Sequence, residues 1–132
     1  MKTFSIIICL LISGCGIDKR EYPVSCPEKE WLVGPPGTEF AFCITAERQI
    51  ALTSTQANGF CASLGKNVCT SDQWSRACME HRSDMIFGGY EWVNGGEFPG
   101  IAHADPYPVD NPTCTRNEYG VFQGVFPFRC CT

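Results

Sequence analysis

Cysteine is the residue type with the widest chemical repertoire in this chain, which contains ten cysteines among 132 residues. Eight of them follow residue 15, at Cys26, Cys43, Cys61, Cys69, Cys78, Cys114, Cys130 and Cys131. Cysteines form structural disulfides, bind metals or exchange electrons as thiols. An even number in a short exported chain favours a framework of up to four disulfides, each of which typically adds about 2–4 kcal/mol of stability.

Spacing limits how some of these cysteines can pair. Cys26 and Cys43 bracket a segment with two short predicted strands, so we expect them to form one bridge. Cys69 and Cys78 flank most of one predicted helix. They are too far apart to pair if that helix is straight, because the Cα atoms of bridged cysteines lie within about 7 Å of each other.

The adjacent cysteines Cys130 and Cys131 allow two interpretations. As a vicinal pair they are a candidate redox centre. Neighbours on a strand, however, point to opposite faces, so each side chain more naturally bridges a different element. We expect one of them to reach Cys61 in the first predicted helix and the other to reach Cys114.

The two histidines give little support to a metal site or to catalysis. His81 follows Cys78 by three residues, but a zinc site needs four ligands. A position in the last turn of a helix, where a cation complements the helix dipole, is the simpler interpretation. His103 precedes Asp105 by two residues without any activated-nucleophile motif. The sequence therefore predicts no metal, no cofactor and no catalytic residue.

Two helices are predicted within residues 53–78 to hold the central cysteines. The first begins at Thr53 or Ser54, which can cap it, and ends before Gly65, where a left-handed residue is favoured. The second begins with the capping-box pattern of Thr70 and Gln73. The helical period predicts buried faces at Ala57, Phe60, Cys61 and Leu64, and at Trp74, Ala77, Cys78 and Met79.

Short strands are predicted on both sides of these helices. Residues 31–33 and 40–44 surround a Pro/Gly loop, residues 90–93 alternate as a strand, and residues 121–131 are β-rich. Residues 97–113 carry four prolines and little periodicity, so we expect an irregular loop there. The pattern predicts an α+β domain.

The N-terminus has the form of an export signal. Lys2 precedes the apolar run Phe4–Ile12, which is too short to span a bilayer as a helix. The run ends in Ile12-Ser13-Gly14-Cys15, which resembles the lipobox of bacterial lipoproteins. That resemblance implies a signal peptide at 1–14, a diacylglycerol-modified Cys15, a lipidated tether at 15–27 and a domain at 28–132. The outer membrane is favoured, because no Asp follows Cys15; an ordinary secretory signal and a secreted domain are the alternative.

The order of motifs from the first helix onward is similar to that of the formylglycine-generating-enzyme family. The matching stretches are Phe60–Lys66 (FCASLGK), Val68–Cys78 (VCTSDQWSRAC), a Tyr-Glu-Trp strand at residues 90–92, and the closing Phe128-Arg129-Cys130. The resemblance implies a C-type-lectin-like fold with two helices and small antiparallel sheets. Enzymes of this family bind copper(I) through two nearby cysteines, whereas this chain offers Cys114 alone in the corresponding region.

A scaffold without its reaction centre favours a binding or interaction module on the bacterial cell envelope. The candidate surface consists of aromatic and amide residues in the strand–loop half, namely Trp92, Asn94, Tyr107 and Tyr119. The membrane, through the lipid, and a protein or glycan are the expected partners. A net charge of −4 argues against nucleic acid. A minimal thiol-dependent enzyme (an oxidase or a thiol–disulfide exchanger) and a coat protein without a specific ligand are the alternatives.

Overall fold

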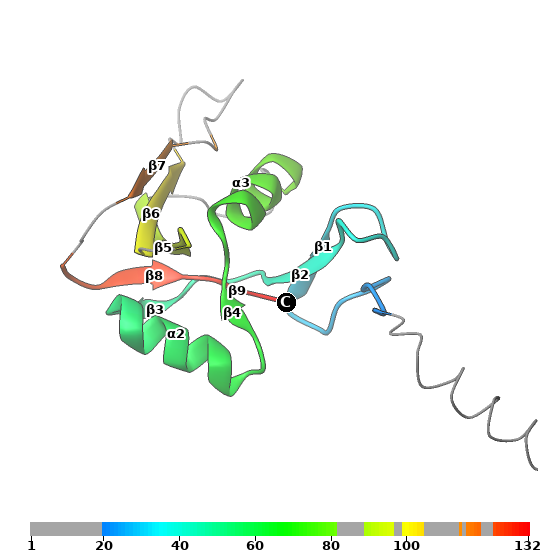
Figure 1. Cartoon of the computed structure of the whole chain (residues 1–132), viewed down its shortest axis with the longest axis horizontal. Helices are drawn as coiled ribbons and strands as arrows, with labels where there is room; N and C mark the ends of the chain where they lie inside the picture. The colour runs from blue at the N-terminus through cyan, green and yellow to red at the C-terminus, as the bar shows by residue number, and fades with distance from the viewer. Residues whose placement is uncertain (1–19, 82–88, 97–98, 105–113, 115, 120–122) are drawn as a thin grey trace, which may run out of the picture.

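The computed structural model describes residues 20–81, 89–96, 99–104, 114, 116–119 and 123–132, which form an α+β structure (Figure 1). Its helices are α2 (Ser54–Ser63) and α3 (Ser71–Glu80). Its strands are β1 (Glu30–Val33), β2 (Phe42–Thr45), β3 (Gln49–Leu52), β4 (Asn67–Val68), β5 (Gly89–Asn94), β6 (Pro99–Ala104), β7 (Arg116–Tyr119), β8 (Phe126–Phe128) and β9 (Cys130–Cys131). The predicted α+β class is confirmed.

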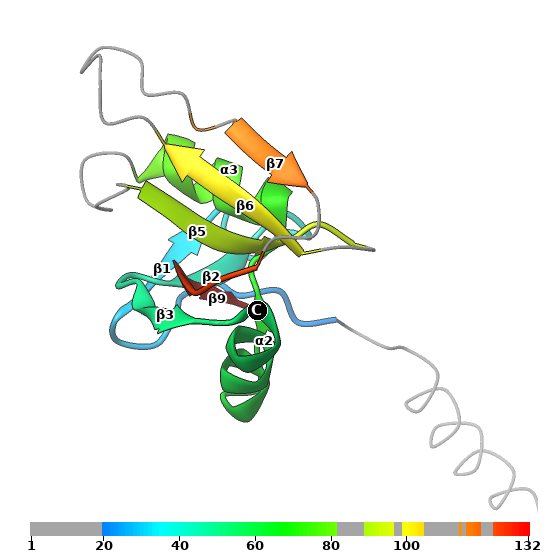
Figure 2. The ribbon, with the colours of Figure 1, turned by 90° about the vertical axis from the view of Figure 1, so that its left-hand side faces the viewer.

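The strands form two small sheets that share the C-terminal segment. One sheet has the order β1-β2-β9-β4 and the other has the order β3-β8-β5-β6-β7. Pairing is antiparallel except between β5 and β8, which run parallel. Because β8 and β9 are separated only by Arg129, the last residues of the chain join the two sheets. Figure 2 shows the β5–β6–β7 ribbon above β2 and β9, with α2 below them.

Both helices begin with the capping box that the sequence predicts for the second. The Thr53 and Thr70 hydroxyls accept hydrogen bonds from the backbone N–H groups of Gln56 and Gln73, at 3.3 and 3.1 Å. The two glutamine side chains in turn accept from the threonine backbone N–H groups. Past the end of α2, Gly65 has a φ of +70°. That left-handed conformation is the reason a glycine ends the helix there.

The buried face of α2 is narrower than the helical period predicts. Ala57 and Cys61 are fully buried, but Phe60 and Leu64 are 36% and 51% exposed. The helix packs against β3 and the short β4, and only the small residues at its centre are fully buried. The Phe60 ring contacts the Phe128 ring edge-on at 5.6 Å between centroids and stays partly exposed. On α3 the predicted Trp74, Ala77 and Cys78 are buried, whereas Met79 is exposed. The predicted burial of Phe60, Leu64 and Met79 is therefore wrong.

Part of the predicted loop at 97–113 is a strand. Residues Pro99–Ala104 form β6, which pairs with β5 from Gly89↔Ala104 to Asn94↔Pro99 and with β7 on its other side. The tight reversal before it uses Gly96, whose φ is +91°. Pairing with two neighbours stabilises this strand although its sequence lacks alternation, which is why the local pattern missed it.

Two apolar clusters make up the core among the described residues. One surrounds α3 and includes Val33, Ile44, Trp74 and Val93. The other lies under α2 and includes Trp92, Ile101 and Phe128, with Phe126 packed edge-on against the Trp92 ring at 4.9 Å between centroids. The adjacent cysteines of β9 belong to different clusters, Cys131 to the first and Cys130 to the second, so the backbone of β9 joins the two clusters.

Candidate functional site

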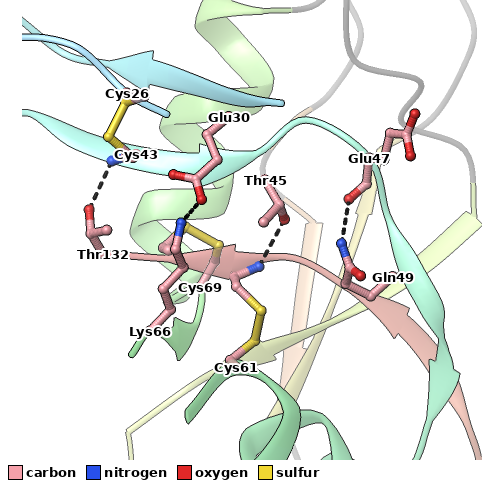
Figure 3. Close-up of polar contacts among 12 residues, drawn as sticks. Cys26, Glu30, Cys43, Thr45, Glu47, Gln49, Cys61, Lys66, Cys69 and Thr132 are labelled. Carbon is pink, nitrogen blue, oxygen red and sulfur yellow. Dashed lines mark hydrogen bonds and ion pairs between the residues drawn. A yellow bond between two sulfur atoms is a disulfide. The ribbon is translucent and has the colours of Figure 1, made fainter. Parts of the chain in front are cut away.

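Four disulfides connect the eight cysteines that follow residue 15. They are Cys26–Cys43, Cys61–Cys130, Cys69–Cys131 and Cys78–Cys114, with Cα–Cα distances of 5.7, 5.5, 4.9 and 5.6 Å. Figure 3 shows the first of these beside the hydrogen bond between the Cys43 N–H and the Thr132 hydroxyl. The pairings predicted for Cys26 and Cys43, and for Cys61 with one vicinal cysteine, are confirmed.

The predicted bridge from the second vicinal cysteine to Cys114 is wrong. β4 pairs antiparallel with β9, in the register Asn67↔Cys131 and Val68↔Cys130. In that register Cys69, the next residue after β4, lies opposite Arg129, and its N–H donates to the Arg129 carbonyl oxygen at 3.1 Å. Because alternate residues of a strand share a face, Cys69 and Cys131 are diagonal neighbours on one face and can bond. Cys78 on α3 is then left for Cys114. Strand pairing between segments more than 60 residues apart decides this connectivity, so it could not be predicted from the local spacing of the cysteines.

Three of the four bridges are buried at both cysteines, whereas in the Cys26–Cys43 bridge Cys26 is only partly buried. Cys43, Cys61, Cys69, Cys78, Cys114, Cys130 and Cys131 are each 3% exposed or less. Thiol–disulfide exchange requires an attacking thiolate to reach one of the two sulfurs. Chemistry at the sulfurs of the three buried bridges therefore first requires local opening of the folded chain.

A hollow of about 360 Å³ lies between the start of α2 and the β5–β6 turn. We call it the α2–β5 hollow. It is lined by Ser54, Thr55, Asn58, Val68, Trp92, Val93, Asn94, Gly96 and Pro99. Its volume is at the lower end of the range of about 300–1,000 Å³ that is usual for small-ligand sites.

Disulfides and hydrogen bonds fix the walls of this hollow. The α2 wall is attached to β9 by the Cys61–Cys130 bridge, and the β4 wall by the Cys69–Cys131 bridge. The Asn94 N–H donates to the Cys69 carbonyl oxygen at 2.9 Å. The vicinal cysteines thus hold both walls in place, which limits the ordering cost of binding a ligand there.

The lining of the hollow is polar and uncharged among the described residues. Ser54 and Thr55 supply hydroxyl groups, while Asn58 and Asn94 supply side-chain amides. These groups both donate and accept hydrogen bonds. Val68, Val93 and Pro99 provide apolar surface beside them. The arrangement suits a neutral ligand that carries hydroxyl or amide groups, and the described lining residues include no carboxylate, histidine or other general acid or base.

The structure places two of the predicted binding residues at this hollow and changes the role of one. Trp92 is only 2% exposed, and its Nε1–H donates to the Leu52 carbonyl oxygen at 2.8 Å. It is therefore a core residue that forms the floor, and its prediction as a surface residue is wrong. Trp92 is buried because both faces of β5 are covered at this point, as the burial of its neighbours Glu91 and Val93 also shows.

Asn94 is exposed at the rim, where its side-chain oxygen accepts from the Gly96 N–H at 3.1 Å. Tyr119 ends β7, and its side chain is outside the described part of the structure. Tyr107 and the proposed lipid site Cys15 also lie outside the described residues. Sequence reasoning missed Ser54, Thr55 and Asn58. The available signal was a capped helix start whose first residues are polar and uncharged.

The histidines do not form a metal site in the part of the chain that is described. His81 caps the C-terminus of α3, and its Nε2 lies 2.9 Å from the Leu32 carbonyl oxygen. Its ring also lies 5.1 Å from that of Trp31. His103 is on β6, and its side chain is outside the described set. Within that set, no group of three or more metal-binding side chains is found.

A buried ion pair joins the two sheets and was not anticipated from the sequence. The Arg129 Nε–H donates to Glu91 Oε1 at 3.0 Å, and the Trp74 Nε1–H donates to Glu91 Oε2 at 3.2 Å. Arg129 also donates to the carbonyl oxygens of Thr45 and Ala46. Both charged side chains are 1% exposed.

Burial has opposite effects on the two charged groups. It raises the pKa of the Glu91 carboxyl, against the opposing attraction of Arg129 and the Trp74 hydrogen bond. It lowers the pKa of Arg129, against the attraction of Glu91. Arg129 lies between β8 and β9, so this pair acts as the polar junction of the two sheets.

Comparison with known proteins gives no relative for this arrangement. No protein-family model matches the chain, and neither the curated proteins nor the solved structures yield a match. Along the described ranges, no helix has the length and apolar character needed to cross a membrane.

Proposed function

We propose that this chain is a lipid-anchored binding module of the bacterial cell envelope, and that the α2–β5 hollow is its ligand site. The observation that carries the proposal is the hollow itself, with hydroxyl and amide groups on walls held by two disulfides. The lipid is attached at Cys15 and holds the domain at the membrane, with the outer membrane favoured.

The scaffold is proposed to be a reduced form of the C-type-lectin-like fold of formylglycine-generating enzymes. Support comes from where the matching motifs lie. The Phe60–Lys66 motif spans the end of α2, the second motif covers β4 and α3, and Phe128-Arg129-Cys130 joins β8 to β9. Cys114, which corresponds to the metal-binding region of the enzymes, is bonded to Cys78.

A neutral glycan is the ligand class that the hollow suits best. Its hydroxyl and amide side chains can replace the hydrogen bonds that a sugar makes with water. An ionised ligand would find no opposite charge among the described lining residues. Burying an unpaired charge is costly, so acidic polysaccharides should bind more weakly than neutral ones.

The test is an NMR titration of the isotope-labelled chain with neutral oligosaccharides of glucose, galactose and N-acetylglucosamine, and with a heparin fragment as the charged comparison. We expect shifts to concentrate on α2 residues 54–58 and on residues 93–96 for a neutral sugar. Asn58→Ala should weaken that binding roughly 3- to 10-fold, the loss of about one hydrogen bond. Asn67→Ala, an exposed asparagine on β4 that does not line the hollow, is the control.

Two results would count against this function. Shifts confined to other surfaces, or equal effects of the two asparagine variants, would remove the hollow as the site. Alkylating the cysteines of the native protein before reduction would distinguish the binding module from the thiol-dependent enzyme. A binding module should show none of the eight bridged cysteines modified in the native state, whereas an exchanger must expose at least one reducible pair.

A further inference from the structure

An exposed apolar surface lies where the chain enters the domain. Tyr22, Val24 and Phe40 are 38%, 70% and 57% exposed. Tyr22 and Phe40 line one open hollow of about 370 Å³ together with Phe42. We call Tyr22, Val24 and Phe40 the tether surface. Single exposed apolar residues are ordinary, but Tyr22 and Phe40 share this hollow and Val24 lies two residues from Tyr22, so together they form a candidate interaction site.

The tether surface is a fixed part of the domain. The Gly37 N–H donates to the Pro23 carbonyl oxygen at 2.9 Å, which attaches the segment between Tyr22 and Val24 to the β1–β2 loop. The Cys26–Cys43 bridge then joins the same segment to β2. Phe40 is held in turn by its carbonyl oxygen, which accepts from Arg76 Nη2 at 2.6 Å. Tyr22, Val24 and Phe40 therefore keep their relative positions.

The short connection to Cys15 brings this surface close to a membrane. Tyr22 follows Cys15 by seven residue steps in the sequence. Even fully extended, they span at most about 25 Å. A domain of about 100 residues has a radius of gyration near 13 Å and hence a diameter of roughly 34 Å. An anchor at Cys15 therefore keeps the tether surface within about 25 Å of the bilayer, which is less than the diameter of the domain.

The charges around the tether surface balance one another. Glu21 and Glu39 line its hollow together with Arg76, and Arg20 is exposed beside them. A balanced set gives no net attraction to anionic headgroups. Aromatic residues such as Tyr and Phe, in contrast, favour the interfacial zone of a bilayer through their apolar area. The partner that fits this chemistry is the interface of a lipid bilayer.

We propose that the tether surface docks on the bilayer interface and orients the domain. This inference rests on the proposed lipid anchor at Cys15. In Figure 1 the segment that follows residue 20 and the start of α2 lie on opposite sides of the domain. Docking through Tyr22, Val24 and Phe40 therefore turns the α2–β5 hollow away from the membrane, where it meets soluble ligands.

The test uses the lipidated full-length product reconstituted in phosphatidylethanolamine/phosphatidylglycerol vesicles that contain brominated acyl chains. Phe40→Trp adds a reporter on the tether surface. Ile50→Trp adds one at an apolar residue that is 76% exposed on β3 and outside that surface. After subtraction of the wild-type signal from Trp31, Trp74 and Trp92, we expect the Phe40→Trp emission to be quenched at least two-fold more strongly than that of Ile50→Trp. The difference should persist in 0.5 M salt, because the contact is apolar.

Flotation of the wild-type chain with the vesicles separates the two proposals. If the chain floats and the two reporters are quenched equally, the lipid anchor stands and the docking surface is overturned. Quenching that high salt abolishes would also overturn apolar docking. A wild-type chain that does not float would remove the anchor, and the orientation inferred from it would fall too.

Discussion

Removing the Arg129 guanidinium should destabilise the fold in a manner that depends on pH. In Arg129→Met, the Glu91 carboxylate loses a partner 3.0 Å away in a site where both side chains are 1% exposed. At an effective dielectric constant near 20, that attraction amounts to about 5 kcal/mol. Breaking one side of a buried pair typically costs about 3–5 kcal/mol, so we expect a loss of that size near pH 7.

The sign of the pH effect follows from Glu91. Its pKa is already raised above 4.5 by burial, and loss of the Arg129 attraction raises it further. Between the unfolded and the folded pKa, the folded state binds more protons, so the free energy of unfolding falls as pH rises. The Arg129→Met penalty should therefore be smallest below pH 4.5, where Glu91 is protonated in both states, and should grow toward neutral pH.

Urea denaturation followed by tryptophan fluorescence at several pH values measures this effect. Trp74 donates to Glu91 and is a local reporter. The double variant Glu91→Gln/Arg129→Met removes both charges and retains an acceptor for Trp74, so it should recover most of the loss near neutral pH. Arg48 also acts electrostatically on both groups and stays unchanged as a common background. A penalty that is the same at pH 4 and pH 7 would refute the reasoning.

Three further predictions concern the backbone and the bridges. Replacing both cysteines of the Cys61–Cys130 bridge should lower the free energy of unfolding by about 1 kcal/mol more than removing the Cys26–Cys43 bridge. The first bridge spans 69 residues and the second spans 17, and the unfolded chain gains more entropy when a longer loop is released. Denaturant midpoints would show this order. Gly34→Ala should destabilise by about 2–3 kcal/mol, since φ is +84° and an added Cβ would lie 2.4 Å from the Phe40 oxygen. Gly59→Ala, in open space on α2, should stabilise the fold slightly. Thermal unfolding scans of the two alanine variants would measure both changes.

Local signals in the sequence were sufficient for the helices and for part of the disulfide framework. The capping boxes at Thr53 and Thr70 satisfy N–H groups within three residues, so a short stretch of sequence is enough to recognise each helix start. Gly65 is similar, since a left-handed exit depends only on its own backbone. The Cys26–Cys43 bridge closes a short loop around one hairpin, which makes it accessible to reasoning from spacing.

The exposed positions on α2 and the strand β6 could not be predicted from local sequence signals. Phe60 and Leu64 obey the helical period and yet face solvent, because the width of the surface under α2 is set by β3 and β4. Pro99–Ala104 has no alternating pattern and forms a strand because β5 and β7 pair with it. The sequence predicts Trp92 as a surface aromatic, whereas the parallel pairing of β5 with β8 buries it.

The sequence by itself thus determined the α+β class, the start of both helices and the end of the first, the even set of bridging cysteines and the uncharged polar start of α2. The tertiary structure alone decided that Cys131 bonds Cys69, that Glu91 meets Arg129, and that Ser54 and Asn58 share a hollow with Asn94. The physical reason is distance along the chain. Capping and helical period act within a few residues, whereas these contacts join segments 36 to 62 residues apart and depend on how the C-terminal strands join the two sheets.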